Sequence, residues 1–266
     1  MNSGIDSSAP TIAIAGGWAR ESIVFSPEVR DEEAGSLEHR AVDLWYPADA
    51  DAVVEQQIEE GNEDDPFWCY LWPTARTLAQ QVFRATCASQ SFDTASLRVL
   101  ETGCGIGLVG LAALAAGGTT VTFQDLRSRS VELALHNARV NGFGDRAIGD
   151  TFDWRSPPNQ TFDWIIASDV LYHVPAHEPL LDFLEGAIGQ REGSPVDSMA
   201  APSTSTLANL TLKGKIWIGD PGRREASAFL QLAQTRFQID VFDAEGGAIG
   251  SPQDGKYQLI VLRPRV

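Results

Sequence analysis

The stretch LRVLETGCGIGLVGLAAL, residues 97–114, decides how the rest of the chain is interpreted. It begins as an apolar strand, passes through closely spaced glycines, and continues with apolar residues at helical spacing. Glycines at a strand-to-helix turn let the backbone approach a ligand, and the free N–H groups of a new helix attract an anion. We therefore expect a cofactor at this turn, although a turn needed only for packing a helix on a sheet would show the same glycines.

Two cofactor fingerprints overlap on these residues. A GxGxxG pattern starts at Gly105, and Asp125 follows twenty residues later, as in dinucleotide sites. Read from Glu101, the same stretch is an acidic residue followed by GxGxG at Gly103, Gly105 and Gly107. The second pattern favours S-adenosylmethionine, because Glu101 can face the ammonium group of that ligand, whereas a carboxylate beside a pyrophosphate is repelled. The carboxylate of the same ligand suits the helix N-terminus, and Asp125 suits the ribose hydroxyls under either interpretation.

Strands and helices alternate after this turn. The alternation predicts an α/β fold, with a doubly wound and mostly parallel sheet covered by helices on both faces. The last two expected strands, 237–243 and 257–264, are joined by a segment too short for a crossover helix, which predicts an antiparallel C-terminal hairpin. Helices are expected at 73–87, from 108 onwards, at 128–140, near 178–187 and near 224–234.

The N-terminal part differs from the rest in charge. The chain has a formal net charge of −16, and residues 1–65 carry 16 acidic residues against three arginines. Short β segments are expected there in TIAIAG, SIVFS and HRAVDLWYP, so we divide the chain into an acidic β extension, 1–66, and a main domain, 67–266. The negative field repels phosphate backbones, which argues against a nucleic-acid partner.

Other features exclude further classes of protein. The start, MNSGIDSSAP, lacks a basic segment, and the longest apolar stretch, near 108–116, is too short to span a bilayer, so a soluble cytoplasmic protein without a membrane partner is expected. The three cysteines form no CxxC pair. The two histidines of HVPAH, 173–177, have a proline between them and no third ligand, so no metal is expected.

Five further stretches resemble a known family. They are YLWPTARTLAQ, VTFQDL with the following NARVNG, TFDWR, FDWIIASDVLYH and IGDPGR. In this order and spacing they resemble the class I, seven-strand S-adenosylmethionine-dependent methyltransferases. Within that class they are most similar to methyltransferase family 16, whose members act on protein lysines, and to the related enzymes that methylate the β subunit of electron transfer flavoprotein. The resemblance covers residues 67 to about 225 and implies a seven-stranded sheet.

The resemblance also implies roles for single residues. It places Asp169 and Tyr172, as the DxxY signature, next to the methyl-accepting nitrogen. It implies that Trp154 lies by the adenine and that Ser168 contacts the cofactor through its backbone. The full set of expected cofactor-binding residues is Trp72, Glu101, Gly103, Cys104, Gly105, Gly107, Asp125, Leu126, Asp153, Trp154 and Ser168.

The expected function is therefore S-adenosylmethionine-dependent N-methylation, with a protein lysine ahead of a small-molecule amine as the acceptor. Two other functions stay open at this point. One is an NAD-dependent oxidoreductase, although no Tyr-x-x-x-Lys pair occurs. The other is a module that keeps the fold without catalysis and holds a basic protein on its acidic face.

Overall fold

The computed structural model describes residues 8–27, 39–61, 66–88, 97–117, 119–189 and 212–265. The strands are β1 (Trp18–Phe25), β2 (Arg40–Pro47), β3 (Arg98–Thr102), β4 (Thr120–Asp125), β5 (Ala147–Thr151), β6 (Trp164–Ser168), β7 (Lys215–Asp220), β8 (Phe237–Phe242), β9 (Ala248–Ile249) and β10 (Gln258–Pro264). The α-helices are α1 (Ala50–Glu59), α2 (Pro73–Ala88), α3 (Leu108–Ala116), α4 (Ser128–Val140), α5 (His177–Ala187) and α6 (Arg224–Ala233). Within the described ranges the short 3₁₀ helices are η1 (Phe67–Cys69), η3 (Gly144–Arg146) and η4 (Val174–Ala176).

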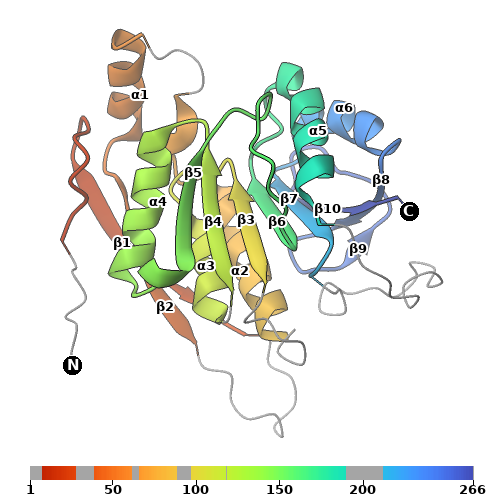
Figure 1. The fold of residues 1–266 in the computed structure, drawn as a ribbon, viewed down its shortest axis with the longest axis horizontal. Helices are drawn as coiled ribbons and strands as arrows, with labels where there is room; N and C mark the ends of the chain where they lie inside the picture. Colours follow the sequence, from red (N-terminus) through yellow and green to blue (C-terminus); the bar gives the residue numbers. More distant parts are fainter. Residues whose placement is uncertain are drawn as a thin grey trace, which may run out of the picture.

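The central sheet has the order β5-β4-β3-β6-β7-β10-β8-β9 (Figure 1). The strands from β5 to β7 pair in parallel, and β10 pairs antiparallel with both β7 and β8. The expected α/β fold and antiparallel C-terminal hairpin are therefore confirmed. The sheet exceeds the seven expected strands by β9, a two-residue strand beside β8.

Helices cover both faces of the sheet, and the side chains of each strand alternate between them. Val99 of β3 belongs to the hydrophobic cluster that includes α2, α3 and α4, whereas its neighbour Leu100 belongs to the cluster that includes α5 and α6. In β6, Ile166 belongs to the first of these clusters and Ile165 to the second. These strands are consequently buried on both sides and read as continuous apolar runs.

The order of the sheet fixes where a ligand can bind. Chain connections run from β3 outward to β4 and β5 on one side, and from β6 to β7 on the other. The order therefore reverses between β3 and β6, and ligands of such sheets bind beyond the carboxyl ends of the strands at this point. The glycine turn after β3 and the end of β6 meet there.

The N-terminal part differs from the expectation in two elements. Strands β1 and β2 form an antiparallel pair in two of the predicted segments. Residues 11–16 form no strand, and Ile12 and Ile14 instead pack partly buried against the core. Helix α1 was not predicted; it begins after Asp49, whose carboxylate accepts the N–H of Ala52 (3.0 Å), a local capping signal that marks a helix start.

Two asparagines on α4 connect the β1–β2 hairpin to the main domain through hydrogen bonds. The Asn137 side chain accepts the Trp45 N–H (2.8 Å) and donates to the Trp45 carbonyl (3.0 Å). Asn141, one helical turn later, makes the same pair of bonds with Asp43 (2.8 and 2.7 Å). Val42 of β2 lies in the same hydrophobic cluster as α3 and α4. The hairpin thus shares the core of the main domain, and the division at residue 66 stays a prediction.

No helix within the described ranges combines the length and apolar character needed to cross a bilayer.

Candidate active site

The glycine turn connects β3 to α3 in a left-handed backbone conformation. Gly103 and Gly105 have φ of 61° and 51°, which residues with a Cβ adopt only with strain. A Cβ on Gly103 would lie 2.7 Å from Val170 Cγ1, and a Cβ on Gly105 would lie 3.1 Å from the Trp68 carbonyl oxygen. Both glycines line the two cavities described next. Because glycine has no side chain, the turn places backbone atoms directly at the surface of these cavities.

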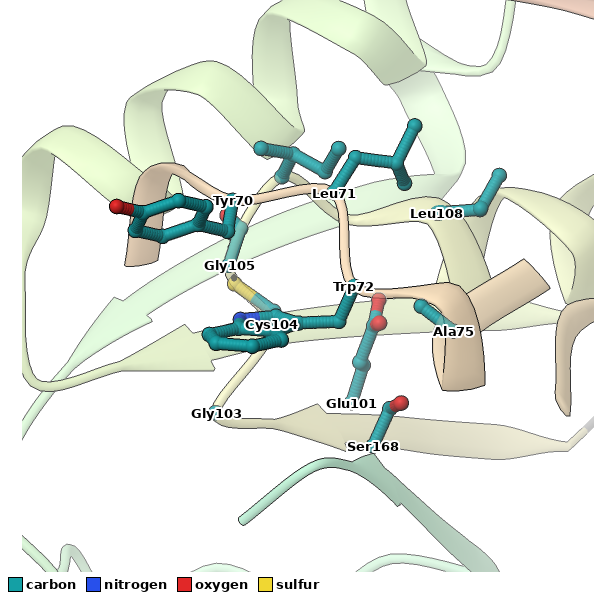
Figure 2. A pocket seen from close by; sticks show the side chains of 11 residues that line it. Tyr70, Leu71, Trp72, Ala75, Glu101, Gly103, Cys104, Gly105, Leu108 and Ser168 are labelled. Atoms are coloured by element: carbon teal, nitrogen blue, oxygen red, sulfur yellow. Dashed lines mark hydrogen bonds between the residues drawn. The ribbon is translucent and has the colours of Figure 1, made fainter. Parts of the chain in front are cut away.

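A small recess lies directly against this turn (Figure 2). Its volume is about 30 Å³, and Glu101 at the end of β3 forms part of its wall. The Glu101 carboxylate accepts the N–H groups of Gly110 (2.8 Å) and Val109 (3.3 Å) in the first turn of α3. These two N–H groups are therefore engaged within the protein, and the expectation that a ligand carboxylate binds at the start of this helix stays a prediction. The recess is lined by Tyr70, Leu71, Trp72, Ala75, Glu101, Gly103, Cys104, Gly105, Ile106, Leu108 and Ser168.

The recess adjoins a cleft of about 860 Å³. Trp72, Gly103, Gly105 and Ser168 line both spaces. The predicted residues that line the cleft are Trp72, Gly103, Gly105, Asp125, Leu126, Asp153, Trp154, Ser168, Asp169 and Tyr172. Tertiary structure thus gathers residues from five separate stretches of sequence around one space.

Asp125 and Trp154 are held in place on the floor of the cleft. The Asp125 carboxylate accepts the N–H groups of Gly105 and Arg127, both at 3.0 Å. The Trp154 indole N–H donates to Thr102 Oγ1 (2.9 Å). Asp125 lines the cleft, and carboxylate oxygens are acceptors suited to hydroxyl groups. The indole ring is fixed beside it as a flat apolar surface.

Three of the predicted cofactor-binding residues do not line the cleft, and Glu101, which lines only the recess, is the first of them. Cys104 lines only the recess; its buried thiol lies 3.6 Å from Ser130 Oγ, and burial raises its pKa well above the ordinary value, which disfavours the reactive thiolate. Gly107 lines neither space. A Cβ there would lie 2.7 Å from Ala134 Cβ and 3.2 Å from Phe123 Cε1, so this glycine permits close packing of the turn against α4 and β4.

Asp169 follows β6 in an unusual backbone conformation. Its φ is 63°, and no other non-glycine residue in the described part of the chain has a positive φ. The carboxylate accepts the Ser168 hydroxyl (2.8 Å) and pairs with the Arg223 guanidinium (2.8 Å). Burial raises the pKa of Asp169 above its ordinary value, although the Ser168 and Arg223 contacts act in the opposite direction. Strain and burial of this kind occur most often at functional sites.

Arg223 is the residue of this site that the sequence interpretation missed. It bridges Asp169 and Asp220 (2.8 and 3.3 Å), and its Cζ lies 5.9 Å from the centre of the Trp72 ring. Its side chain is only 19% exposed. The signal was present in the stretch IGDPGR, but the spacing from Asp169 in sequence gave no reason to pair the two residues.

The mouth of the cleft is unusually apolar. Nine large apolar side chains are exposed in the described part of the chain, and five of them line the cleft. The five are Ile58, Phe67, Trp72, Leu126 and Tyr172; we call this set the apolar rim. Concentrated exposed apolar groups mark interaction sites on soluble folds. Helix α1, which contributes Ile58, has acidic but no basic side chains.

A family model described as lysine methyltransferase matches residues 54–196, which is more than half of the chain. The chain belongs to this family. The match includes the glycine turn and the DxxY signature, and it begins within helix α1, so the family expectation drawn from the motifs is confirmed.

Individual relatives agree with this family. A histidine protein methyltransferase 1 homolog from Dictyostelium discoideum is 33% identical over 121 residues, which cover 43% of this chain and 37% of that protein. A protein N-terminal and lysine N-methyltransferase from Cryptococcus neoformans is 28% identical over 161 residues, 55% of this chain and 51% of that protein. The match therefore spans only about a third to a half of these relatives.

A solved structure supports the fold. A protein from Pyrococcus horikoshii, proposed to be an RNA methyltransferase, superposes with a TM-score of 0.51 at 11% identity, covering 77% of this chain and 92% of that one. At this identity the likeness concerns the fold alone.

Proposed function

We propose that the protein transfers a methyl group from S-adenosylmethionine to a nitrogen of a protein side chain, with lysine as the acceptor. The observation that carries the proposal is the pairing of two spaces at the switch point of the sheet. One is a recess beside the Glu101 carboxylate, and the other is an open cleft that contains Asp169 and Tyr172. When bound, S-adenosylmethionine supplies an electrophilic methyl group on a positively charged sulfur.

The residues present fit this cofactor. Glu101 offers a buried carboxylate to an ammonium group, and the left-handed glycines leave room where a Cβ would obstruct the backbone. Asp125 offers acceptor oxygens to ribose hydroxyls, while Trp154 and Leu126 offer apolar surface to an adenine. We propose that Trp72, Gly103, Cys104, Asp153 and Ser168 line the same ligand, and that Gly107 acts only by shaping the turn.

The apolar rim supports a protein acceptor over a small molecule. A small amine would be enclosed by a closed pocket, whereas this cleft is open and ringed by exposed apolar side chains. The acidic helix α1 beside it favours a basic segment. Both features suit a lysine presented on a protein surface.

The acceptor amine must be neutral before it can attack. A lysine amine has an ordinary pKa of about 10.4 and is protonated at neutral pH. Apolar surroundings favour the neutral amine. Asp169, whose own pKa burial raises, can accept an amine N–H and hold the lone pair in line. Arg223 keeps the Asp169 carboxylate in its orientation, and Tyr172 lines the same cleft.

Labelled S-adenosylmethionine incubated with the protein and a cell extract tests the proposed function. Mass spectrometry should find the label on lysine side chains of proteins. Label on histidine or on N-terminal amines would contradict lysine as the acceptor. Label confined to small molecules would contradict a protein substrate. Calorimetry with NAD in place of S-adenosylmethionine should show no binding.

We further propose a cytoplasmic location, which the three unpaired cysteines support.

Cofactor affinity should depend on pH through Glu101. Burial raises the pKa of Glu101 to about 8, so most of the free protein carries a neutral carboxyl group at neutral pH. A ligand ammonium would favour the ionised form, so binding should release a proton, and affinity should rise between about pH 6 and 8. Calorimetry in buffers of different ionisation enthalpy measures this release.

The variant Glu101→Gln provides the control for this pH dependence, because any proton lost by the ligand itself is still released. The difference in proton release between the two proteins therefore belongs to Glu101. Equal proton release by both would show that Glu101 does not face the ammonium group.

A further inference from the structure

One wall of the recess comes from outside the sheet. Tyr70, Leu71 and Trp72 line it opposite Glu101 and the glycine turn (Figure 2). The same segment begins at Trp68, whose carbonyl oxygen lies 3.1 Å from where a Cβ on Gly105 would stand. The position of this segment therefore sets the width of the recess and the space above the glycine turn.

Helix α1 holds this wall through three consecutive residues. The Trp68 indole N–H donates to Gln57 Oε1 (2.7 Å), and the Cys69 thiol lies 3.6 Å from the Ala50 carbonyl oxygen. The Tyr70 hydroxyl donates to the Asp51 carboxylate. Each bond joins the wall to a different position on α1, so the wall cannot shift without breaking contacts along the helix.

Gln57 is the buried member of this arrangement. It is 3% exposed, and its amide nitrogen donates to the carbonyls of Pro66 (3.1 Å) and Val53 (3.3 Å) while its oxygen accepts from Trp68. Both donor hydrogens and the acceptor are used. A buried amide satisfied in this way specifies one geometry, because any displacement leaves polar groups unpaired.

We propose that α1 is part of the cofactor site, and that Gln57 is a positioning residue that holds the wall Trp68–Trp72 against the glycine turn. The inference rests on S-adenosylmethionine as the cofactor. It assigns a role in cofactor affinity to the N-terminal part of the chain, which the glycine motif and the DxxY signature do not include.

Full-length variants test this inference by calorimetry with S-adenosylmethionine. Gln57→Leu and Trp68→Phe should each raise the dissociation constant about tenfold, the loss expected for one buried hydrogen bond. The double variant should be no weaker than Gln57→Leu, because that change already removes the bond that is lost in Trp68→Phe. Gln57 lines neither the recess nor the cleft, so the KM of Gln57→Leu for the protein acceptor should stay unchanged.

The neighbouring variant Gln56→Leu is the matched control. Gln56 lies on the same helix but bonds to Ala15 and Glu60 away from the recess, so its replacement should leave cofactor affinity unchanged. Melting temperatures are measured in parallel. If Gln57→Leu fails to fold, Tyr70→Phe, which removes only the bond to Asp51, should still weaken binding about threefold.

The outcomes separate the two proposals. A wild-type protein that does not bind S-adenosylmethionine would overturn the proposed function. A wild-type protein that binds it, together with Gln57→Leu and Tyr70→Phe variants that bind equally well, would overturn only the role of α1. Lower melting temperatures with unchanged dissociation constants would also overturn the role of α1, because the contact between Gln57 and Trp68 would then contribute to stability alone.

Discussion

Replacing Asp169 by asparagine is expected to lower the rate of methyl transfer about 100-fold or more, which is typical of losing a group that handles the transferred proton. Asparagine has nearly the same shape and tolerates a positive φ, so the backbone at 63° should persist. Arg223 keeps Asp220 as a partner. The variant therefore removes the charge that faces the acceptor amine and leaves most of the surrounding structure in place.

Two measurements distinguish a catalytic role from a structural one. The dissociation constant for S-adenosylmethionine, from calorimetry, should change by less than about tenfold, since Asp169 lies outside the recess. Single-turnover rates report the transfer step itself. Asp145→Asn, an exposed acidic position on η3, serves as the control for a change of charge. Full turnover by Asp169→Asn would remove this carboxylate from the mechanism.

Replacing Gly107 by alanine is expected to lower the free energy of unfolding by about 3 kcal/mol, by combining backbone strain with overpacking. The residue has φ of 83° at the start of α3. A new Cβ would meet the Cβ and Cα of Ala134 at 2.7 and 3.0 Å, and backbone atoms of α4 cannot move aside cheaply. Urea denaturation measures the loss.

The control for this prediction is Gly142→Ala. Gly142 has a similar φ of 75°, but nothing lies within 4 Å of a Cβ built there. This variant should lose only about 1 kcal/mol, the cost of the left-handed backbone alone. Equal losses at the two positions would mean that Gly107 is required for its conformation and not for helix packing.

Local patterns were enough to predict most of the main domain. Apart from the two-residue strand β9, the strands and helices from α2 to β10 lie where apolar periodicity and turn residues placed them, because their signals are contained in a few consecutive residues. Helix α1 escaped prediction since it has few apolar positions, and its buried face includes Gln57. The segment 11–16 looked like a strand by composition, but no neighbouring strand pairs with it among the described residues.

The sequence predicted some residues of the candidate site and missed the residues that hold them in place. Glycine and DxxY motifs identified residues near the cleft, because each motif belongs to one strand end. The partners of those residues were not predicted. Arg223 lies 54 residues beyond Asp169, and the bond between Gln57 and Trp68 joins two elements outside the motifs.

The fold class, the family and the position of the glycine turn follow from short periodic segments and local motifs, so they could be predicted from the amino-acid sequence. Three contacts became visible only in the folded chain: Glu101 binds N–H groups in the first turn of α3, Arg223 pairs with Asp169, and α1 contacts the segment that lines the recess. Such contacts depend on distances between segments far apart in the chain. Those distances are set by how the whole sheet and its helices pack, so they cannot be derived from a local sequence pattern.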